Sequence, residues 1–284
     1  MSFEVHRPGS LQEALEILEK YGEDVRPIAG GTDLVLAVRS GALKVGHIMD
    51  ITRIPELRTL DLDGDTLIVG AAVTISELLE LEVVRERLPA LWEAMYWLGS
   101  PQIRNVATLV GNICNASPAA DTAPPLMIYD ARVRILGPGG KRVIPIEEFF
   151  VHVKKTVLEP GEMVGFVEIP IKEGFRSRFR KIGKRRAEVL SIVNAAVGFF
   201  FGNGRMEGVR IALGSVAPTP IRARTAEAVL EGKEPSMELV EEAASRAREE
   251  TRPISDVRAS AEYRREMTFV LVRRLILDLL GGVP

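Results

Sequence analysis

The chain has 284 residues, of which 46% are hydrophobic and 27% are charged, and its net charge is −2. This length predicts two domains or one large one, with a core that needs no disulfide or structural metal. The apolar content and the 25 Gly and 17 Pro spread along the chain exclude disordered, collagen-like and coiled-coil classes. The near-neutral charge gives no sign of a nucleic-acid or membrane-surface partner, and the single cysteine, Cys114, excludes an internal disulfide or a thiolate cage for zinc or iron–sulfur within this chain.

The N-terminal part is predicted to mix short strands and helices. Two capping-box patterns, Ser10-x-x-Glu13 and Thr74-x-x-Glu77, each precede apolar residues at helical spacing. In chain order the predicted elements are a strand at 3–5, a helix ending at Gly22, a strand at 25–29, a helix at 34–39, a hairpin of 60–62 and 66–69 around Asp63-Gly64, a helix after Thr74, a helix at 90–98, strands at 132–136 and 141–144, and a strand at 163–169.

The composition shifts at residues 170–174, and a smaller C-terminal domain is predicted to follow. It opens with a basic segment at 176–186, continues with two strands paired across Gly202-Asn203-Gly204, and ends with helices at 236–250 and 260–280. The whole chain is therefore assigned to the α+β class, with domains at 1–173 and 174–284, the second built from a three-stranded antiparallel sheet and helices.

The first candidate site is the loop Ile28-Ala29-Gly30-Gly31-Thr32-Asp33. Two glycines let a backbone approach a ligand closely, and successive N–H groups entering a helix form an anion-binding concavity. A plain turn between a strand and a helix would show the same residues, so this loop alone does not identify a ligand.

The second candidate site is the segment at 102–121, which shows neither helical nor strand periodicity over its middle. Such a segment is either a surface loop or a backbone wrapped around a polar ligand. Thr108, Gly111, Asn112 and Asn115 offer hydroxyl, amide and backbone donors to phosphate oxygens, and Asp121 offers an acceptor for a ribose diol.

Two separated glycine loops favour a dinucleotide, because its pyrophosphate carries two charged groups. The site is not of the Rossmann type, since no Gly-x-Gly-x-x-Gly follows a strand, and no Walker A sequence occurs.

These two loops closely resemble those of the medium, FAD-binding subunit of molybdenum hydroxylases, the group that includes carbon monoxide dehydrogenase and xanthine dehydrogenase. The likeness spans nearly the whole chain, and the second loop is its most specific part. Further segments that carry it are Arg7-Pro-Gly-Ser-Leu11, Val69-Gly-Ala-Ala-Val-Thr74 and Gly214-Ser-Val-Ala-Pro-Thr-Pro-Ile-Arg222. The resemblance implies a first domain of the vanillyl-alcohol-oxidase/PCMH type, with subdomains at about 1–55 and 56–173, and a second of the carbon monoxide dehydrogenase flavoprotein C-terminal type.

The resemblance also implies roles for single residues. The first loop would bind the pyrophosphate together with the second, and Asp121 would bind the ribose of the adenosine half. Val164 matches an apolar position near adenine, Lys181 a lysine near the flavin ring, and Leu98 a position flanking the isoalloxazine. The predicted FAD-binding residues are Ile28, Ala29, Gly30, Gly31, Thr32, Asp33, Leu98, Thr108, Gly111, Asn112, Asn115, Asp121, Val164 and Lys181.

One position departs from the family pattern, which usually has Gly-Gly-Asn where this chain has Val110-Gly111-Asn112. A valine fits there if its φ is negative and its side chain points away from FAD, and its N–H then becomes a weaker candidate donor to phosphate. Cys114 lies inside the same loop and is interpreted as a small buried residue rather than a redox thiol.

The implied activity is electron transfer rather than substrate chemistry on this chain. A large molybdopterin subunit would oxidise the substrate, and electrons would pass through the [2Fe–2S] clusters of a small subunit to the FAD here and on to an external acceptor. The sequence shows no catalytic triad, carboxylate dyad or metal-ligand cluster, and its three histidines are interpreted as structural. Two other hypotheses stay open, a self-sufficient FAD-dependent oxidoreductase of the same fold and a non-catalytic nucleotide-binding protein.

The basic segment at 176–186 has three interpretations, a charged strand face, a positive environment for the flavin, or a surface for a partner subunit. No targeting signal is visible, and the apolar stretch at 267–280 is interrupted by charges and too short to span a bilayer, so a cytoplasmic protein is expected.

Overall fold

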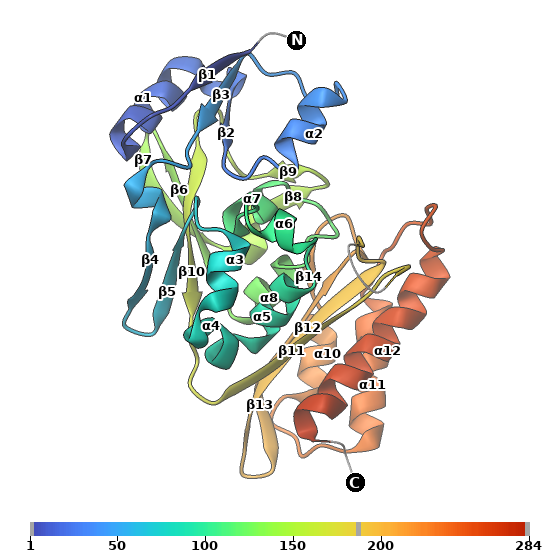
Figure 1. Ribbon diagram of the computed structural model, residues 1–284. Helices are drawn as coiled ribbons and strands as arrows, with labels where there is room; N and C mark the ends of the chain where they lie inside the picture. The colour runs from blue at the N-terminus through green and yellow to red at the C-terminus, as the bar shows by residue number, and fades with distance from the viewer. Residues whose placement is uncertain (1–2, 186–188, 282–284) are drawn as a thin grey trace.

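The computed structural model describes residues 3–185 and 189–281 (Figure 1). Arg186, the last residue of the predicted basic segment, lies outside the described residues. Across the described ranges no helix combines the length and the apolar character that crossing a membrane requires.

A small parallel sheet forms the N-terminal corner of the molecule (Figure 1). Its strands, in spatial order, are β1 (Glu4–His6), β3 (His47–Asp50) and β2 (Val25–Ile28), and its helices are α1 (Leu11–Tyr21), η1 (Gly22–Asp24) and α2 (Leu34–Arg39). The predicted cap begins α1, because the Ser10 hydroxyl accepts from the Glu13 N–H at 3.3 Å, and Gly22 ends it at a φ of 51°. Local signals alone therefore set the bounds of this helix.

An antiparallel sheet follows, in the order β4-β5-β10-β6-β7, with short helices packed beside it. The strands are β4 (Leu60–Asp63), β5 (Thr66–Gly70), β10 (Met163–Pro170), β6 (Arg132–Gly137) and β7 (Gly140–Pro145), with β8 (Phe150–His152) and β9 (Lys155–Thr156) as a separate hairpin. The helices are η2 (Pro55–Arg58), α3 (Ile75–Glu80), α4 (Glu82–Arg87), α5 (Pro89–Tyr96), α6 (Pro101–Arg104), α7 (Leu109–Cys114), α8 (Ala123–Ile128) and α9 (Ile146–Phe149). Both hydrogen bonds of the predicted Thr74–Glu77 capping box are present.

The C-terminal part is a four-stranded antiparallel sheet with three helices on one face. Its elements are β11 (Phe175–Ile182), β12 (Val193–Gly202), β13 (Arg205–Gly214), β14 (Ile221–Arg222), α10 (Arg224–Leu230), α11 (Met237–Glu249) and α12 (Ala261–Leu280). The three long strands agree with the prediction, whereas β14 is a fourth strand of two residues, too short to produce an alternating pattern in the sequence.

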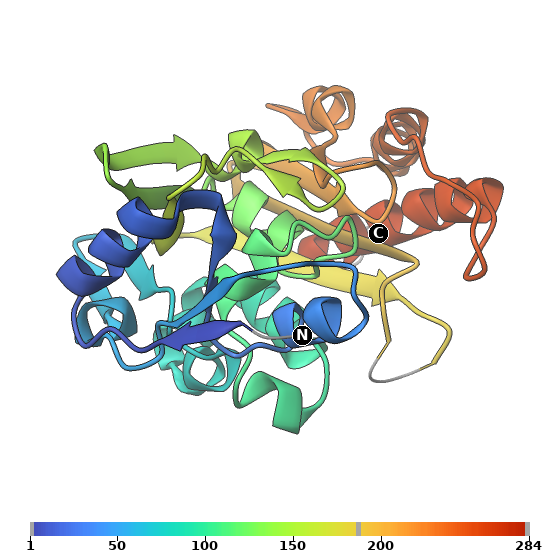
Figure 2. The same ribbon diagram turned by 90° about the horizontal axis from the view of Figure 1, so that it is seen from above.

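The C-terminal sheet separates two hydrophobic cores. Along β12, Ala196 joins the core of the N-terminal part, while Ala195 and Val197 join a second core beneath α10, α11 and α12. Helices α5 and α8 cover the face of the C-terminal sheet that bears Ala196, so both faces of this sheet are buried. Seen from above, the N-terminal sheet and the C-terminal helices lie on opposite sides of the molecule (Figure 2). The α+β class predicted from the sequence is confirmed.

The segment at 102–121 differs from the prediction of an irregular loop. It contains the end of α6 and all of α7, and α8 follows directly. These helices have four to six residues, fewer than two turns, so apolar periodicity has no room to develop. The starts of α6 and α7 are set instead by the caps Ser100 and Thr108, whose hydroxyls accept from the N–H of the third residue of each helix.

Candidate functional site

The two predicted glycine loops meet in space. The first leaves the end of β2 and enters α2, and Gly31 takes a φ of +68° within it. At Gly30 a Cβ atom would lie 2.0 Å from the carbonyl oxygen of Val106, so only glycine allows this approach to the second loop. A hydrogen bond of 2.6 Å from Asn115 Nδ2 to Asp33 Oδ1 joins the loops a second time.

The second loop is held by its own cap and by the N-terminal part around it. Thr108 is buried, and its hydroxyl accepts from the Gly111 N–H at 3.0 Å, which fixes the first turn of α7. The Ile75 N–H donates to the carbonyl of Ala107 at 2.8 Å, so helix α3 also anchors this loop. The backbone of the loop is therefore fixed by the fold.

The two asparagines of the second loop act as connectors between segments. Asn112 Oδ1 accepts from the hydroxyl of Thr122 at 2.6 Å, which ties α7 to the start of α8. Asn115 Oδ1 accepts from Lys154 Nζ at 2.5 Å, while its amide nitrogen binds Asp33. Both side chains hold the shape of the loops, and Lys154 adds a positive charge beside them.

Asp121 and Lys181 form a buried ion pair between the two parts of the chain. Asp121 is 7% exposed, and its Oδ2 lies 2.6 Å from Lys181 Nζ. Its Oδ1 accepts from Ser191 Oγ and, at 2.9 Å, from Asn194 Nδ2. Lys181 on β11 and Asn194 on β12 are paired in register, so the sheet presents both to the same carboxylate. Sequence reasoning found the ion pair's members separately and missed Ser191 and Asn194.

Two predicted apolar residues outside the loops, Leu98 and Val164, are buried. Leu98 is 9% exposed and precedes Gly99, and the Arg104 guanidinium donates to the Leu98 carbonyl at 3.0 Å. Val164 is 3% exposed and lies at a bulge of β10, the strand that packs against α7. Val164 belongs to the N-terminal core, and Leu98 is held by the bond from Arg104.

The departure at Val110 is accommodated inside the core. Val110 is 4% exposed within α7, where the helical backbone has negative φ, and its side chain joins the N-terminal core. Cys114, at the end of the same helix, is packed against that core, and burial raises the pKa of its thiol to about 12. A thiol that stays protonated at neutral pH is a poor nucleophile, which agrees with the interpretation of Cys114 as a packing residue.

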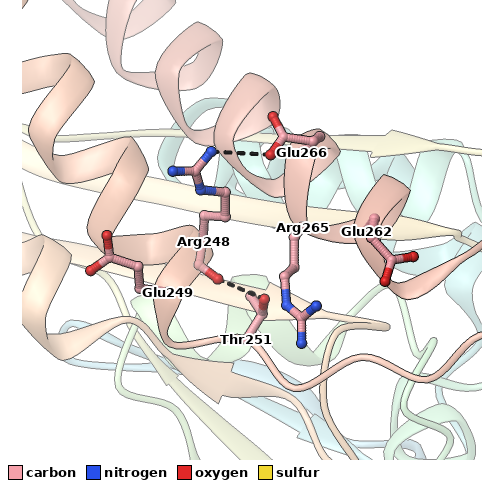
Figure 3. Close-up of a pocket in the computed structure, with 6 residues that line it drawn as sticks. All are labelled: Arg248, Glu249, Thr251, Glu262, Arg265 and Glu266. Atoms are coloured by element: carbon pink, nitrogen blue, oxygen red, sulfur yellow. Dashed lines mark hydrogen bonds and ion pairs between the residues drawn. The ribbon is translucent and has the colours of Figure 1, made fainter.

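A hollow of about 380 Å³ lies elsewhere, between α11 and α12 (Figure 3). It is lined by Arg248, Glu249, Thr251, Glu262, Arg265 and Glu266, with Arg248 and Glu266 paired across it at 3.0 Å. None of the predicted FAD-binding residues lines it, and its charges are mixed, so it is not the site that the glycine loops form.

Glycine-rich turns with successive backbone N–H groups can hold a pyrophosphate, so the paired loops fit a dinucleotide such as FAD. Comparison with known families agrees. Residues 1–172 match the FAD binding domain in molybdopterin dehydrogenase, and residues 178–279 match the CO dehydrogenase flavoprotein C-terminal domain.

Known relatives cover the chain almost from end to end. The xanthine dehydrogenase FAD-binding subunit of Escherichia coli O157:H7 is 34% identical over 280 residues, 98% of this chain and 96% of that subunit. The carbon monoxide dehydrogenase medium chain of Hydrogenophaga pseudoflava is 32% identical over 275 residues, 96% of each. A solved carbon monoxide dehydrogenase from the same organism, lacking the Mo-pyranopterin moiety, superposes with a TM-score of 0.95 at 33% identity, covering 99% of this chain and 98% of that one.

The fold and the two loops thus define an oxidoreductase flavoprotein subunit. The chain belongs to the family of FAD-binding medium subunits of molybdenum hydroxylases, as the resemblance in its sequence implied.

Proposed function

We propose that this chain binds FAD and carries electrons from the [2Fe–2S] clusters of a small subunit to an external acceptor, while a large molybdopterin subunit oxidises the substrate. The observation that carries the proposal is the meeting of the two glycine loops, joined by the Asn115–Asp33 hydrogen bond and the close approach at Gly30, in a chain of this family. When bound, FAD supplies the electron-transfer chemistry, and the protein supplies placement and electrostatics.

The loops would hold the pyrophosphate by their backbones. Ala29 to Asp33 supply one turn, and Thr108, Gly111, Asn112 and Asn115 supply the other. The N–H groups of Gly111, Asn112 and Asn115 donate within α7, and Asn115 uses both amide atoms to hold the loops. Asn112 bonds Thr122 through its Oδ1, so we assign the phosphate contacts mainly to the backbone N–H groups of the first loop and to the amide nitrogen of Asn112. The N–H of Val110 stays a weaker candidate.

Asp121 and Lys181 would act as one unit. The resemblance implied that Asp121 binds the ribose of the adenosine half and that Lys181 lies near the flavin ring, yet the two side chains form one ion pair of 2.6 Å. We therefore propose that the pair faces a single part of the cofactor. Asp121 holds the ammonium in place, and the ammonium supplies positive charge at that point. Leu98 and Val164 would bound the rings with apolar surface.

The basic residues of strand β11 differ in their contacts, and we propose that they differ in role. Arg180 forms an ion pair of 2.6 Å with Asp278 of α12, and Arg178 forms one of 2.5 Å with Glu93 of α5. These contacts favour the interpretation of the outer arginines as a structural charged face, which leaves Lys181 as the basic residue of the strand directed to the site.

We also propose the finer organisation expected from the sequence. The domain boundary would lie between residues 173 and 174, with the first domain divided at about residue 55. The complex would work in the cytoplasm. Tyr96, Trp97, Ile103 and Val106 are each between 39% and 47% exposed around α5 and α6, an apolar surface available to the cofactor or to a partner subunit.

The test is to purify the chain from its native source at low salt, record the visible spectrum, and identify the released cofactor and the accompanying chains. Non-covalent FAD together with an iron–sulfur chain and a molybdopterin chain is the expected result. A lone yellow chain that turns over a substrate would replace the proposal with a self-sufficient oxidoreductase. A lone colourless chain that takes up no added FAD would refute FAD binding itself.

A further inference from the structure

A cluster of imidazoles lies on the N-terminal sheet, apart from the glycine loops. Strands β1 and β3 are parallel neighbours, and Glu4 pairs in register with His47. His6, two residues after Glu4, points to the same face of the sheet because side chains alternate along a strand. The sheet thus brings His47 to Glu4 and His6, which lie more than forty residues earlier in the sequence.

The donor atoms of the cluster converge. His6 Nε2 lies 2.9 Å from His47 Nδ1, Glu4 Oε2 lies 3.7 Å from His47 Nδ1, and one ligand atom from each residue lies within 4.8 Å of the others. Zinc binds imidazole nitrogen and carboxylate oxygen at about 2.0–2.2 Å in a tetrahedral arrangement. That geometry places neighbouring donor atoms about 3.3–3.5 Å apart. Side-chain rotations that move the donor atoms by a few tenths of an ångström to about one ångström would therefore produce a tetrahedral site.

Surrounding groups hold the imidazoles in place. The ring of Tyr21 stacks on His47 with centroids 3.9 Å apart and lies 5.0 Å from the ring of His6. On the far side of His47, Asp24 Oδ2 lies 3.9 Å from Nε2, and the Gly46 N–H fixes this carboxylate by donating to its Oδ1 at 2.9 Å. At 3.9 Å this carboxylate is too far for a hydrogen bond to His47, so it contributes negative charge beside the ring.

The accessibility of the cluster suits a bound ion. The side chains of His6 and His47 are 14% and 18% exposed, whereas that of Glu4 is 64% exposed. The rings therefore need to shift by only a few tenths of an ångström, the exposed carboxylate is free to rotate onto an ion, and the open side admits water as a fourth ligand. Carboxylates at Glu4 and Asp24 flank the rings and favour a cation there.

We propose that Glu4, His6 and His47 form a binding site for a divalent transition metal, with zinc as the ion that best matches two imidazoles and a carboxylate. The ion fastens the three-residue edge strand β1 to β3. His47 is the first residue of β3 and the first glycine loop follows the last residue of β2, so the parallel strands put the metal at the opposite end of the sheet from that loop. The site is structural and does not rest on the proposed function.

The test uses the full chain without a polyhistidine tag, stripped with a chelator and then dialysed against zinc. We expect one zinc per chain by elemental analysis, and a higher unfolding temperature with the metal than without it. Glu4→Gln, His6→Asn and His47→Asn should each weaken zinc binding at least about tenfold. His152→Asn, at an exposed position of β8, should bind as the wild type does.

Two results would overturn the proposal. One is that neither the wild-type chain nor the His152→Asn control takes up zinc. The other is uptake that the Glu4, His6 and His47 substitutions leave unchanged, which would mean that the metal binds elsewhere. Glu4→Gln keeps the test decisive if a histidine variant misfolds, because an exposed side chain contributes little to packing. Circular dichroism checks the fold of each variant.

Discussion

Replacing Arg222 with methionine should destabilise the protein far more than the same change at its neighbour Arg224. Arg222 lies on β14 with its side chain only 3% exposed. Its guanidinium makes two hydrogen bonds to Glu227, at 2.6 and 2.8 Å, and one of 2.8 Å to Glu147. Burial disfavours the charged form of Arg222, but the carboxylates of Glu227, Glu147 and Asp130 together outweigh burial and raise the pKa of Arg222. The arginine is charged and its partners depend on it.

The size of the effect follows from the burial of the partners. Glu227 is 7% exposed and also accepts from the Ile211 N–H, so without Arg222 its charge would stay buried with one neutral donor. Breaking such a pair typically costs about 3–5 kcal/mol of unfolding free energy. Arg224 also pairs with Glu147, at 2.7 Å, but its side chain is 62% exposed, and exposed pairs contribute about 0–1 kcal/mol. The two variants should therefore differ by several kcal/mol.

Urea-induced unfolding, followed by circular dichroism with excess FAD in every sample, measures this difference. Arg222→Met should lower the midpoint strongly and Arg224→Met only slightly. Adding Glu227→Gln to Arg222→Met should restore part of the loss, because glutamine keeps an acceptor for the Ile211 N–H and removes the unpaired charge. Equal midpoints for the two single variants, or a double variant no more stable than Arg222→Met, would show that the buried charge is not the cause.

Three further predictions concern the site and the pH dependence. Lys181→Met should weaken FAD binding about tenfold or more in a fluorescence titration, as loss of a charge-assisted hydrogen bond does. Lys141→Met, at an exposed position of β7, should leave the affinity unchanged. Equal affinities for the two variants would remove Lys181 from the site. Cys114 should resist alkylation by iodoacetamide at pH 8 in the folded protein, because burial raises the pKa of its thiol to about 12; mass spectrometry showing rapid labelling would contradict this. The hydrogen bond from Arg142 lowers the pKa of Glu162 below 4.5, so this carboxylate stabilises the fold above that pH, and its contribution is lost as the pH falls through the lowered value. Arg142→Met should therefore flatten the loss of unfolding free energy below about pH 4.5. An unchanged dependence of unfolding free energy on pH would refute the assignment.

Local chemistry predicted much of the fold. The caps at Ser10 and Thr74 and the hairpin at Asp63-Gly64 fixed their elements, because each signal acts within about four residues of itself. Helices α6 and α7 were missed since they are too short for periodicity, although the hydroxyls of Ser100 and Thr108 mark their starts. A search for caps, rather than for apolar spacing, would have found them.

Long-range neighbours could not be predicted in the same way. Asp121 was assigned as an acceptor from its position in the second loop, but Ser191 and Asn194 come about seventy residues later. Asn194 reaches it beside Lys181 because β11 and β12 pair in register. The contact of His6 with His47 depends likewise on the parallel pairing of β1 and β3. In both clusters the register of a sheet decides which polar groups meet, and this register cannot be deduced from a single sequence by inspection.

Gly30 shows how far a motif alone can be interpreted. The sequence suggests that its missing side chain makes room for a ligand, whereas the structure shows the carbonyl of Val106 where a Cβ would lie. The glycine is needed because one loop packs directly on the other, so each loop fixes the backbone of its neighbour. A pyrophosphate held between them would therefore meet donors positioned before it binds, and a side chain at residue 30 would disturb both loops together rather than one contact.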